Sequence, residues 1–591
     1  MRIVYQRVLI IAMNMNKNRI LYVLLCCCLV CLPLTAHMTY DGKRPVYDKL
    51  TDTYLLTLPD SVFGHPYNAA AVIDDTVSWV RVAGKTVWKT ANFPIVNGDT
   101  TYTVMYAHNG RLSEIKLRFT SLPILCMDGT FDTEYKLGQV RITMPDDTTT
   151  QHYQARIKWA GGTTTYDWIN KHNYHIKFVD ENLEKMDVSF FGLRNDNHWR
   201  LDAGIIDMLR YRNKAAHGLW ADFGNKPYYA DAQPNARSYS RGNHVEVFLN
   251  GEYMGFFDLH EFLDRKQMKL KKYDEVQGKF HGLMWKGKDE TEQTMFIASK
   301  PVDNTVERWG GFDIMYPDLD DVSPTNYDVL ADAISFVAES DSLTFVSKVA
   351  DRFDLPILAD YYVFINVLFA IDNTCKNIIW SCYDCAQSNK LTLSVWDLEA
   401  TVGQHWYDGD GFFHAEEIGP ENDLDQYGHR FSKLWLSRLF MRLRQMPEFN
   451  EMVKARYWEL RRTILQPDSL IARYAAIHNN LERSGAINRE TERWSGDRDL
   501  AYRPLDFDAE FDYLSDWIVR RIAYLDSNTF AVLRGDVNGD GEVNIRDVSL
   551  FIDYLLNDEN VLIMKINSDV NMDFEVSIKD LSWLIDMLLE H

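Results

Sequence analysis

The chain has 591 residues, too many for one hydrophobic core, so roughly three or four domains are expected. Hydrophobic residues make up 46% of it and aromatic residues 13%, a composition that excludes a disordered chain. The formal net charge is −22, and such an acidic surface repels nucleic acid and anionic lipid, so we expect neither as a partner.

The first 36 residues have the pattern of a signal peptide. Lys17 and Arg19 precede the apolar run 20–34, which is short for a membrane-spanning helix and has the length of a signal-peptide core. The run is followed by Thr35-Ala36, where signal peptidase is expected to cut. We therefore expect removal of residues 1–36, no remaining transmembrane segment, and a mature chain that is secreted, either extracellular or associated with the cell surface.

The cysteines leave two questions open. Those of the signal segment suggest lipidation, although the small residue that normally precedes a lipidated cysteine is missing: Cys26, Cys27, Cys28 and Cys31. Further along, Cys382 and Cys385 form a single CxxC pair. A zinc site needs two more ligands, for which Cys375 is one candidate, so a local disulfide or ordinary thiols are the favoured interpretations.

Residues 39–150 are predicted to form a β-sandwich domain. The segments 102–106 and 115–119 are rich in β-forming residues. Asn97-Gly98-Asp99 and Asn109-Gly110 supply turns beside them.

Residues 151–530 are predicted to form an α+β domain with a helical C-terminal part. Residues 245–257 predict a β-hairpin around Asn250-Gly251, 353–370 predict a helix, and 391–396 predict a strand that ends at Asp397. From about 431 to 527 the apolar spacing is helical, with a break and a new helix start at Pro467-Asp468-Ser469.

The C-terminal residues 533–591 contain a duplicated acidic segment, 536–547 and 569–580, about 33 residues apart. Calcium prefers six to eight oxygen ligands, and an EF-hand-like loop supplies them from positions 1, 3, 5, 7, 9 and 12. These positions hold Asp536, Asn538, Asp540, Glu542, Asn544 and Asp547 in the first copy, and Asp569, Asn571, Asp573, Glu575, Ser577 and Asp580 in the second. Position 7 contributes only its carbonyl, and position 6 is Gly541 in one copy but Phe574 in the other, so the second loop is the less ideal.

Each loop runs directly into an apolar helix, and this pattern resembles the dockerin type I family. The resemblance implies a small all-α, calcium-binding module that docks onto a cohesin module of a scaffoldin in a cellulosome, mainly through residues near loop positions 10 and 11. Those residues are Ile545-Arg546 and Ile578-Lys579. A module of this size buries too little surface to be stable alone, so calcium bound only by the folded form would supply the missing stability.

A second set of polar residues has the spacing of a phosphoryl-transfer site. Asp372 and Asn377 are separated as D-x4-N, and Asp397 follows the predicted strand 391–396. Phosphoryl transfer needs a carboxylate beside the attacking hydroxyl, oxygen ligands for Mg²⁺ and a cation on the phosphates. The spacing alone also arises by chance, and Asp397 would then only cap a turn.

Several segments together resemble the CotH kinase family over about residues 150–525. They are Asp207, 212–214, 245–257, Glu261, 372–377 and 396–403. The resemblance implies an atypical protein serine/threonine kinase that binds ATP and Mg²⁺. Within it Asp372 would be the base or a second metal ligand, Asn377 would hold Mg²⁺, and Asp397 would be the main metal ligand.

The resemblance also implies that a lysine reaches the phosphates, with Glu261 as its orienting partner; the candidates are Lys171, Lys177 and Lys286. The sequence departs from the family at two places. Residues 159–164 lack the arginine of the family's motif before the lysine, and Glu399 stands where the last motif usually has aspartate.

Three functions remain open from the sequence. The first is a secreted kinase that phosphorylates serine or threonine of extracellular proteins while its dockerin tethers it to a cohesin-bearing assembly. The second is a degenerate, non-catalytic kinase that acts as a structural or binding component of that assembly. The third is a polysaccharide-degrading enzyme, although no carboxylate pair, including Glu416-Glu417, is placed as a glycosidase requires.

Overall fold

The computed structural model describes residues 38–73, 77–108, 110–320, 322–407, 411–414, 437–495, 504–557, 561–573 and 575–590. The predicted signal peptide, Asn109, Glu416-Glu417 and Phe574 lie outside these residues. Contacts divide the chain into two compact units, Met1–Ser121 with Thr143–Thr150 and Leu122–Ile142 with Gln151–His591. Among the described helices, none combines the length and the apolar character needed to cross a bilayer.

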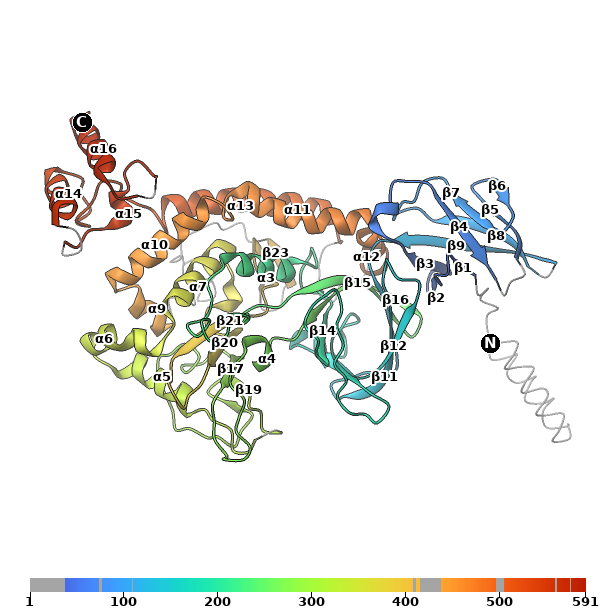
Figure 1. Ribbon diagram of the computed structural model, residues 1–591, viewed down its shortest axis with the longest axis horizontal. Helices are drawn as coiled ribbons and strands as arrows, with labels where there is room; N and C mark the ends of the chain where they lie inside the picture. The colour runs from blue at the N-terminus through green and yellow to red at the C-terminus, as the bar shows by residue number, and fades with distance from the viewer. Residues whose placement is uncertain are drawn as a thin grey trace. The chain divides into compact units, whose positions relative to one another are not determined.

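The N-terminal region is β-rich, as predicted (Figure 1, blue). A three-stranded sheet contains β1 (Thr39–Tyr40), β4 (Tyr67–Val72) and β7 (Thr90–Phe93). A six-stranded sheet contains β2 (Val46–Asp48), β3 (Thr53–Thr57), β9 (Arg111–Thr120), β8 (Tyr102–His108), β5 (Val77–Val82) and β6 (Lys85–Val87). Both sheets contribute to one core, in which Phe93 packs edge-on against Tyr102 and Phe119 at ring separations of 5.4 and 4.9 Å.

The middle region mixes helices and strands, as predicted, and begins with a closed barrel. Its strands are β10 (Ile124–Asp128), β11 (Lys136–Thr143), β12 (Thr150–Ala160), β13 (Asn173–Val179), β14 (His198–Asp202), β16 (Glu252–Glu261) and β15 (Gly242–Leu249). The predicted hairpin forms β15 and β16. Asn250 and Gly251 turn it with φ of +52° and +81°, the left-handed pair that a two-residue hairpin loop requires.

A five-stranded sheet follows the barrel in the sequence. Its order is β18 (Arg308–Trp309), β19 (Phe312–Tyr316), β17 (Leu283–Gly287), β20 (Ile378–Cys382) and β21 (Leu391–Val395). The helices in this part of the chain are α3 (Arg212–Phe223), α4 (Arg265–Met268), α5 (Asp328–Glu339), α6 (Ser342–Arg352) and α7 (Leu355–Leu368). Helix α7 is the helix predicted at 353–370, and it is apolar on nearly all sides because it is buried on nearly all sides.

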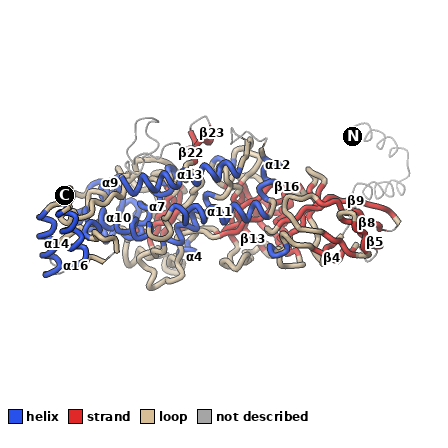
Figure 2. The backbone as a smooth tube through the Cα atoms, turned by 90° about the horizontal axis from the view of Figure 1, so that it is seen from above, coloured by secondary structure: helices blue, strands red, loops and turns tan. Residues whose placement is uncertain are grey.

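The helical part comes next, with α9 (Arg438–Leu443), α10 (Pro447–Arg461), α11 (Pro467–Arg483), α12 (Ala486–Trp494) and α13 (Phe507–Ser527). Figure 1 shows α11 and α13 side by side, and Figure 2 shows the helices in blue and the barrel strands in red. Helix α12 contacts the barrel strand β16. The predicted break at Pro467 is the first residue of α11, where a missing amide proton costs nothing.

The C-terminal region is small and helical. It contains α14 (Ile545–Asn557), α15 (Lys565–Ser568) and α16 (Ile578–Leu589), and α14 and α16 close over a small core that includes Val537, Phe551 and Leu584.

A buried ionic cluster ties α12 to the barrel. Glu490 accepts hydrogen bonds from Lys171 (2.8 Å), from Arg210 (3.1 Å) and from the backbone amide of Phe256 (3.2 Å). A Cβ at Gly255 would lie only 1.9 Å from a Glu490 carboxylate oxygen, so the barrel strand must carry glycine there. The carboxylate therefore neutralises cations that water cannot reach.

Glu490→Ala is expected to lower the free energy of unfolding by about 3–5 kcal/mol, because it leaves Lys171 and Arg210 buried without their counter-charge. Denaturant unfolding of the full chain measures this. The exposed Glu482→Ala should change stability by less than about 0.5 kcal/mol; equal effects of the two variants would contradict a structural role for the cluster.

Candidate functional site

Asp372 lies in a loop that brings three polar side chains together before β20. The side-chain nitrogen of Asn377 donates to one Asp372 carboxylate oxygen at 2.7 Å, and the Lys376 ammonium lies 2.6 Å from the other oxygen. Burial raises the pKa of Asp372 to about 6 although Lys376 opposes the shift, and the negative charge of Asp397 adds to it. Asp372 can therefore take up a proton near neutral pH.

The backbone of this loop is held against the end of β17. The backbone amide of Asn377 donates to the Gly287 carbonyl at 2.8 Å. A Cβ at Gly287 would lie 2.7 Å from the Cys375 carbonyl oxygen, so only glycine allows this approach. Asn377 has a φ of +57°, a left-handed conformation that a side chain adopts only where its surroundings enforce it.

Asp397 and Glu399 lie on a turn that follows β21. Asp397 also has a left-handed backbone, with φ of +58°. The Leu398 amide between them donates to the Asn213 side-chain oxygen at 3.1 Å, and the Asn213 side-chain nitrogen donates to Asp202 at 2.8 Å. Asn213 thus connects the turn to the end of β14.

Carboxylates crowd around Glu399. Burial raises its pKa well above the usual range, and the charges of Asp202 and Asp397 raise it further, while Arg200 acts in the opposite direction. Like charges held this close are stabilised by a cation placed between them.

Two cations lie on the ring of Trp396, the residue before Asp397. The Arg200 guanidinium is 5.0 Å from the ring centre and the Lys286 ammonium is 5.2 Å away. Burial lowers the pKa of Lys286 to about 8, although Asp397 raises it. Lys288, on the same strand segment, lies 3.8 Å from the position of a Cβ at Gly162, which brings the loop at 161–162 to the same place.

The structure brings together five of the eight residues predicted for the phosphoryl-transfer site. They are Asp372, Asn377, Asp397, Glu399 and Lys286. It also adds residues that the sequence analysis did not select: Asp202, Arg200, Lys376 and Lys288. Asp202 ends a strand, as Asp397 follows one, but residues 198–202 were not predicted as a strand and this signal was missed.

The other three predicted residues have partners elsewhere. Lys171 is fully buried and donates to the Ala203 carbonyl and to Glu490. Lys177 lies 4.6 Å from the centre of the Tyr135 ring. Glu261 accepts from the Arg194 backbone amide at 2.8 Å and from Arg241 at 3.0 Å, rather than from a lysine.

The donor chemistry fits magnesium. Asp372, Asn377, Asp397 and Glu399 offer carboxylate and amide oxygens, which are the ligands that hard divalent cations prefer. Cys382, at the end of β20, and Cys385 are free thiols rather than a disulfide, and burial raises the pKa of Cys382 to about 12 and of Cys385 to about 11.

The duplicated C-terminal loops have the same geometry. The carboxylate at position 12 accepts two backbone amides in each: Asp547 from Asn538 (3.1 Å) and Asn544 (2.8 Å), and Asp580 from Asn571 (3.1 Å) and Ser577 (3.0 Å). In each loop this carboxylate thereby ties positions 3 and 9 to position 12.

The second loop has the ligand set for calcium. Carboxylate oxygens of Asp569, Asp573 and Asp580 lie within 4.8 Å of one another, and among the described residues they are the acidic group that meets this criterion. Met572 has a φ of +66° where the first loop has Gly539 at +74°, a second departure from the ideal that the sequence analysis did not notice. Both loops fit calcium in the chemistry of their ligands.

Comparison with known families explains both sites. The family model described as CotH kinase protein matches residues 158–525, more than half of the chain. The chain belongs to the CotH kinase family. The model described as dockerin type I domain matches residues 534–589, and no curated protein matches the chain.

Both predicted resemblances are therefore confirmed. Membership of the CotH kinase family suggests an atypical kinase, and a dockerin implies binding to a cohesin, typically with calcium bound. The two together suggest a component of a cellulosome-type assembly.

Asp547→Ala and Asp580→Ala are each expected to reduce the calcium bound per chain from about two ions to about one, measured by calorimetric titration. Calcium at a hundredfold excess over Kd should stabilise each intact loop by about 2.7 kcal/mol. Asp586→Asn, an exposed change on α16, should leave the stoichiometry unaltered; chelation that leaves the tail equally stable would contradict the calcium assignment.

Asn213→Ala is expected to weaken the affinity for Mg²⁺ in the presence of ATP by about 10–100-fold, because the turn that carries Asp397 loses its anchor. Titration of Mg²⁺ at fixed ATP measures the shift. Asn235→Ala, an exposed change, serves as the control; an unchanged Mg²⁺ affinity in Asn213→Ala would show that the turn holds its shape without this anchor.

Proposed function

We propose that this protein is a secreted atypical kinase that transfers the γ-phosphoryl group of ATP to serine or threonine of extracellular proteins. The convergence of Asp372 and Asn377 with Asp397 and Glu399, beside Lys286 of β17, carries the proposal. A carboxylate with a pKa near 6, oxygen ligands and cations on one cluster are the parts that phosphoryl transfer needs.

Each residue has a role in this proposal. Asp397, Asn377 and Glu399 would hold Mg²⁺, which supplies positive charge to the phosphates when bound. Lys286 binds the phosphate oxygens. The acceptor oxygen bonds to the γ-phosphorus, the bond from that phosphorus to the β,γ-bridging oxygen breaks, ADP leaves with the electron pair, and Asp372 takes the hydroxyl proton.

The C-terminal module positions this activity. Ile545 and Ile578, the position-10 residues of the two loops, are 70% and 71% exposed, as cohesin-contacting residues must be. We propose that the module, within residues 533–591, tethers the kinase-like region 151–530 and a β-sandwich at 39–150 to a cohesin outside the cell. Removal of residues 1–36 as a signal peptide would place the chain there.

A non-catalytic role is the second candidate. Lys171 is held by Glu490 in a buried ion pair, and residues 159–164 lack the family's arginine, so phosphate binding rests on fewer cations than the family offers. In this role the candidate site around Asp372 and Asp397 would bind protein without transferring phosphate. Neither of the two matching family models is that of a polysaccharide hydrolase.

Asp397→Asn is expected to reduce phosphoryl transfer by about 10²–10³-fold, the usual cost of losing one charge-stabilising group, with folding unchanged. Transfer from radiolabelled ATP to dephosphorylated casein measures it, and the exposed Asp303→Asn is the matched control. Wild-type protein that binds no Mg²⁺·ATP would exclude the kinase and leave the non-catalytic role.

The rate should follow a bell-shaped pH profile with limbs near 6 and 8. Asp372 accepts a proton only above its pKa of about 6, and Lys286 is charged only below its pKa of about 8. Lys286→Arg should move the alkaline limb upward, because a guanidinium stays charged. An alkaline limb that does not move would remove Lys286 from phosphate binding.

A further inference from the structure

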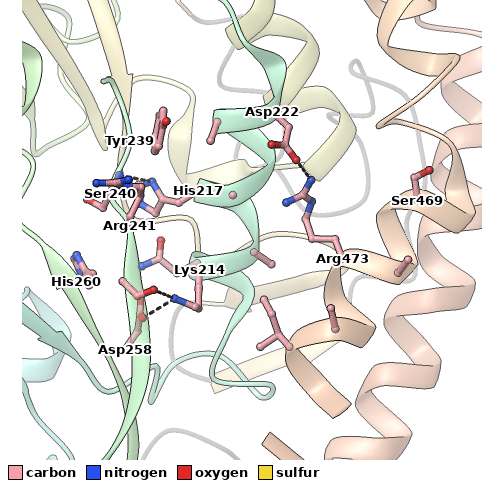
Figure 3. Close-up of a pocket in the computed structure, with 18 residues that line it drawn as sticks. Lys214, His217, Asp222, Tyr239, Ser240, Arg241, Asp258, His260, Ser469 and Arg473 are labelled. Atoms are coloured by element: carbon pink, nitrogen blue, oxygen red, sulfur yellow. Dashed lines mark hydrogen bonds and ion pairs between the residues drawn. The ribbon is translucent and has the colours of Figure 1, made fainter. Parts of the chain in front are cut away.

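A cavity of about 660 Å³ lies between α3, α11, the segment 239–242 and β16 (Figure 3). Its size is that of a site for a small ligand or a short peptide segment. Lys286, which is proposed to bind the phosphates, and the neighbouring Lys288 do not line it.

Each cation of the cavity already has a counter-charge. Lys214 forms an ion pair with Asp258, drawn as a dashed line in Figure 3, at a distance of 2.9 Å. Burial opposes the ionisation of Asp258, but Lys214 helps to lower its pKa to about 2. Arg473 pairs with Asp222 across the two helices, and Arg241 lies 3.0 Å from Glu261. A phosphate would find no unpaired cation among these residues.

The histidines of the cavity are neutral. Burial lowers the pKa of His217 to about 3 and lowers that of His260 as well. The His217 ring accepts the Ser240 backbone amide at Nδ1, so its proton is on Nε2. A neutral ligand with hydroxyl or amide groups suits this lining.

Small side chains form the walls on the helices. Helix α3 contributes Ala215, Gly218 and Ala221, and α11 contributes Ala472 and Ala476. Tyr239 is the aromatic residue of the lining. A slot with small walls admits an extended chain, whereas sugar rings usually stack on larger aromatic surfaces.

The cavity adjoins the turn of the candidate active site. Asn213 lines the cavity and accepts the Leu398 amide at 3.1 Å, next to Asp397. The charge of Asp397 also acts on His217 across the same wall. A ligand in the cavity is therefore placed beside the residue proposed to hold Mg²⁺.

We propose that this cavity is the acceptor site, and that it binds a neutral segment of polypeptide that carries serine or threonine. The proposal rests on the kinase function. The nucleotide occupies the side of the cluster that carries Lys286. The acceptor occupies the cavity, where each cation is paired with a carboxylate.

Ala476→Trp tests the proposal, because the exposed alanine on α11 faces the cavity and a large side chain would fill it. The probe is an array of fluorescent dodecapeptides with one central serine or threonine, bound to the full chain without ATP. Wild type should bind a subset, and Ala476→Trp should weaken that binding by roughly tenfold or more. Asn479→Trp, also exposed on α11 but outside the cavity, should not.

The outcomes separate the two proposals. Unchanged ATP affinity in Ala476→Trp supports a site distinct from the nucleotide, and a matching loss of ATP affinity overturns it. No peptide binding, or binding of cellohexaose that Ala476→Trp abolishes, also overturns it. Peptide binding that Ala476→Trp removes, in a chain that transfers no phosphate, keeps the cavity as a peptide site and rejects the kinase alone.

Discussion

The candidate site depends on a hydrogen-bond relay of three residues. Asp202 at the end of a barrel strand holds the side chain of Asn213 on α3, and Asn213 holds the Leu398 amide in the turn after β21. The relay fixes a turn whose Asp397 has a left-handed backbone, a conformation with an intrinsic cost. Through this relay, the barrel, helix α3 and the five-stranded sheet together fix the position of the Asp397 carboxylate.

The middle region and the C-terminal loops share one physical feature, which is a group of closely spaced carboxylates. In the middle region Asp372 and Glu399 have raised pKa values because burial and neighbouring acids disfavour their charge. In the C-terminal loops Asp569 and Asp580 are buried close together. Both arrangements store repulsion that a divalent cation would relieve, although one cation would serve chemistry and the other would serve folding.

Local patterns were predictable from the sequence, and long-range pairings were not. The calcium loops, the hairpin at 245–257 and the D-x4-N loop each depend on neighbours within a few residues, so their spacing was visible. Lys171 was selected for phosphate binding from the family resemblance. The sequence could not show that its partner is Glu490, which lies 319 residues away. Asp202 and Arg200 were missed for the same reason, since only the closed barrel brings β14 to the turn at Asp397.

Gly287 has a wider consequence. Its missing side chain lets the Cys375–Asn377 backbone rest on β17, although it bears no chemistry itself. A single methyl group there would push the loop off the strand and separate Asp372 from Asp397. A side chain at this position would therefore disrupt the cluster even in a related chain that retains every acidic residue.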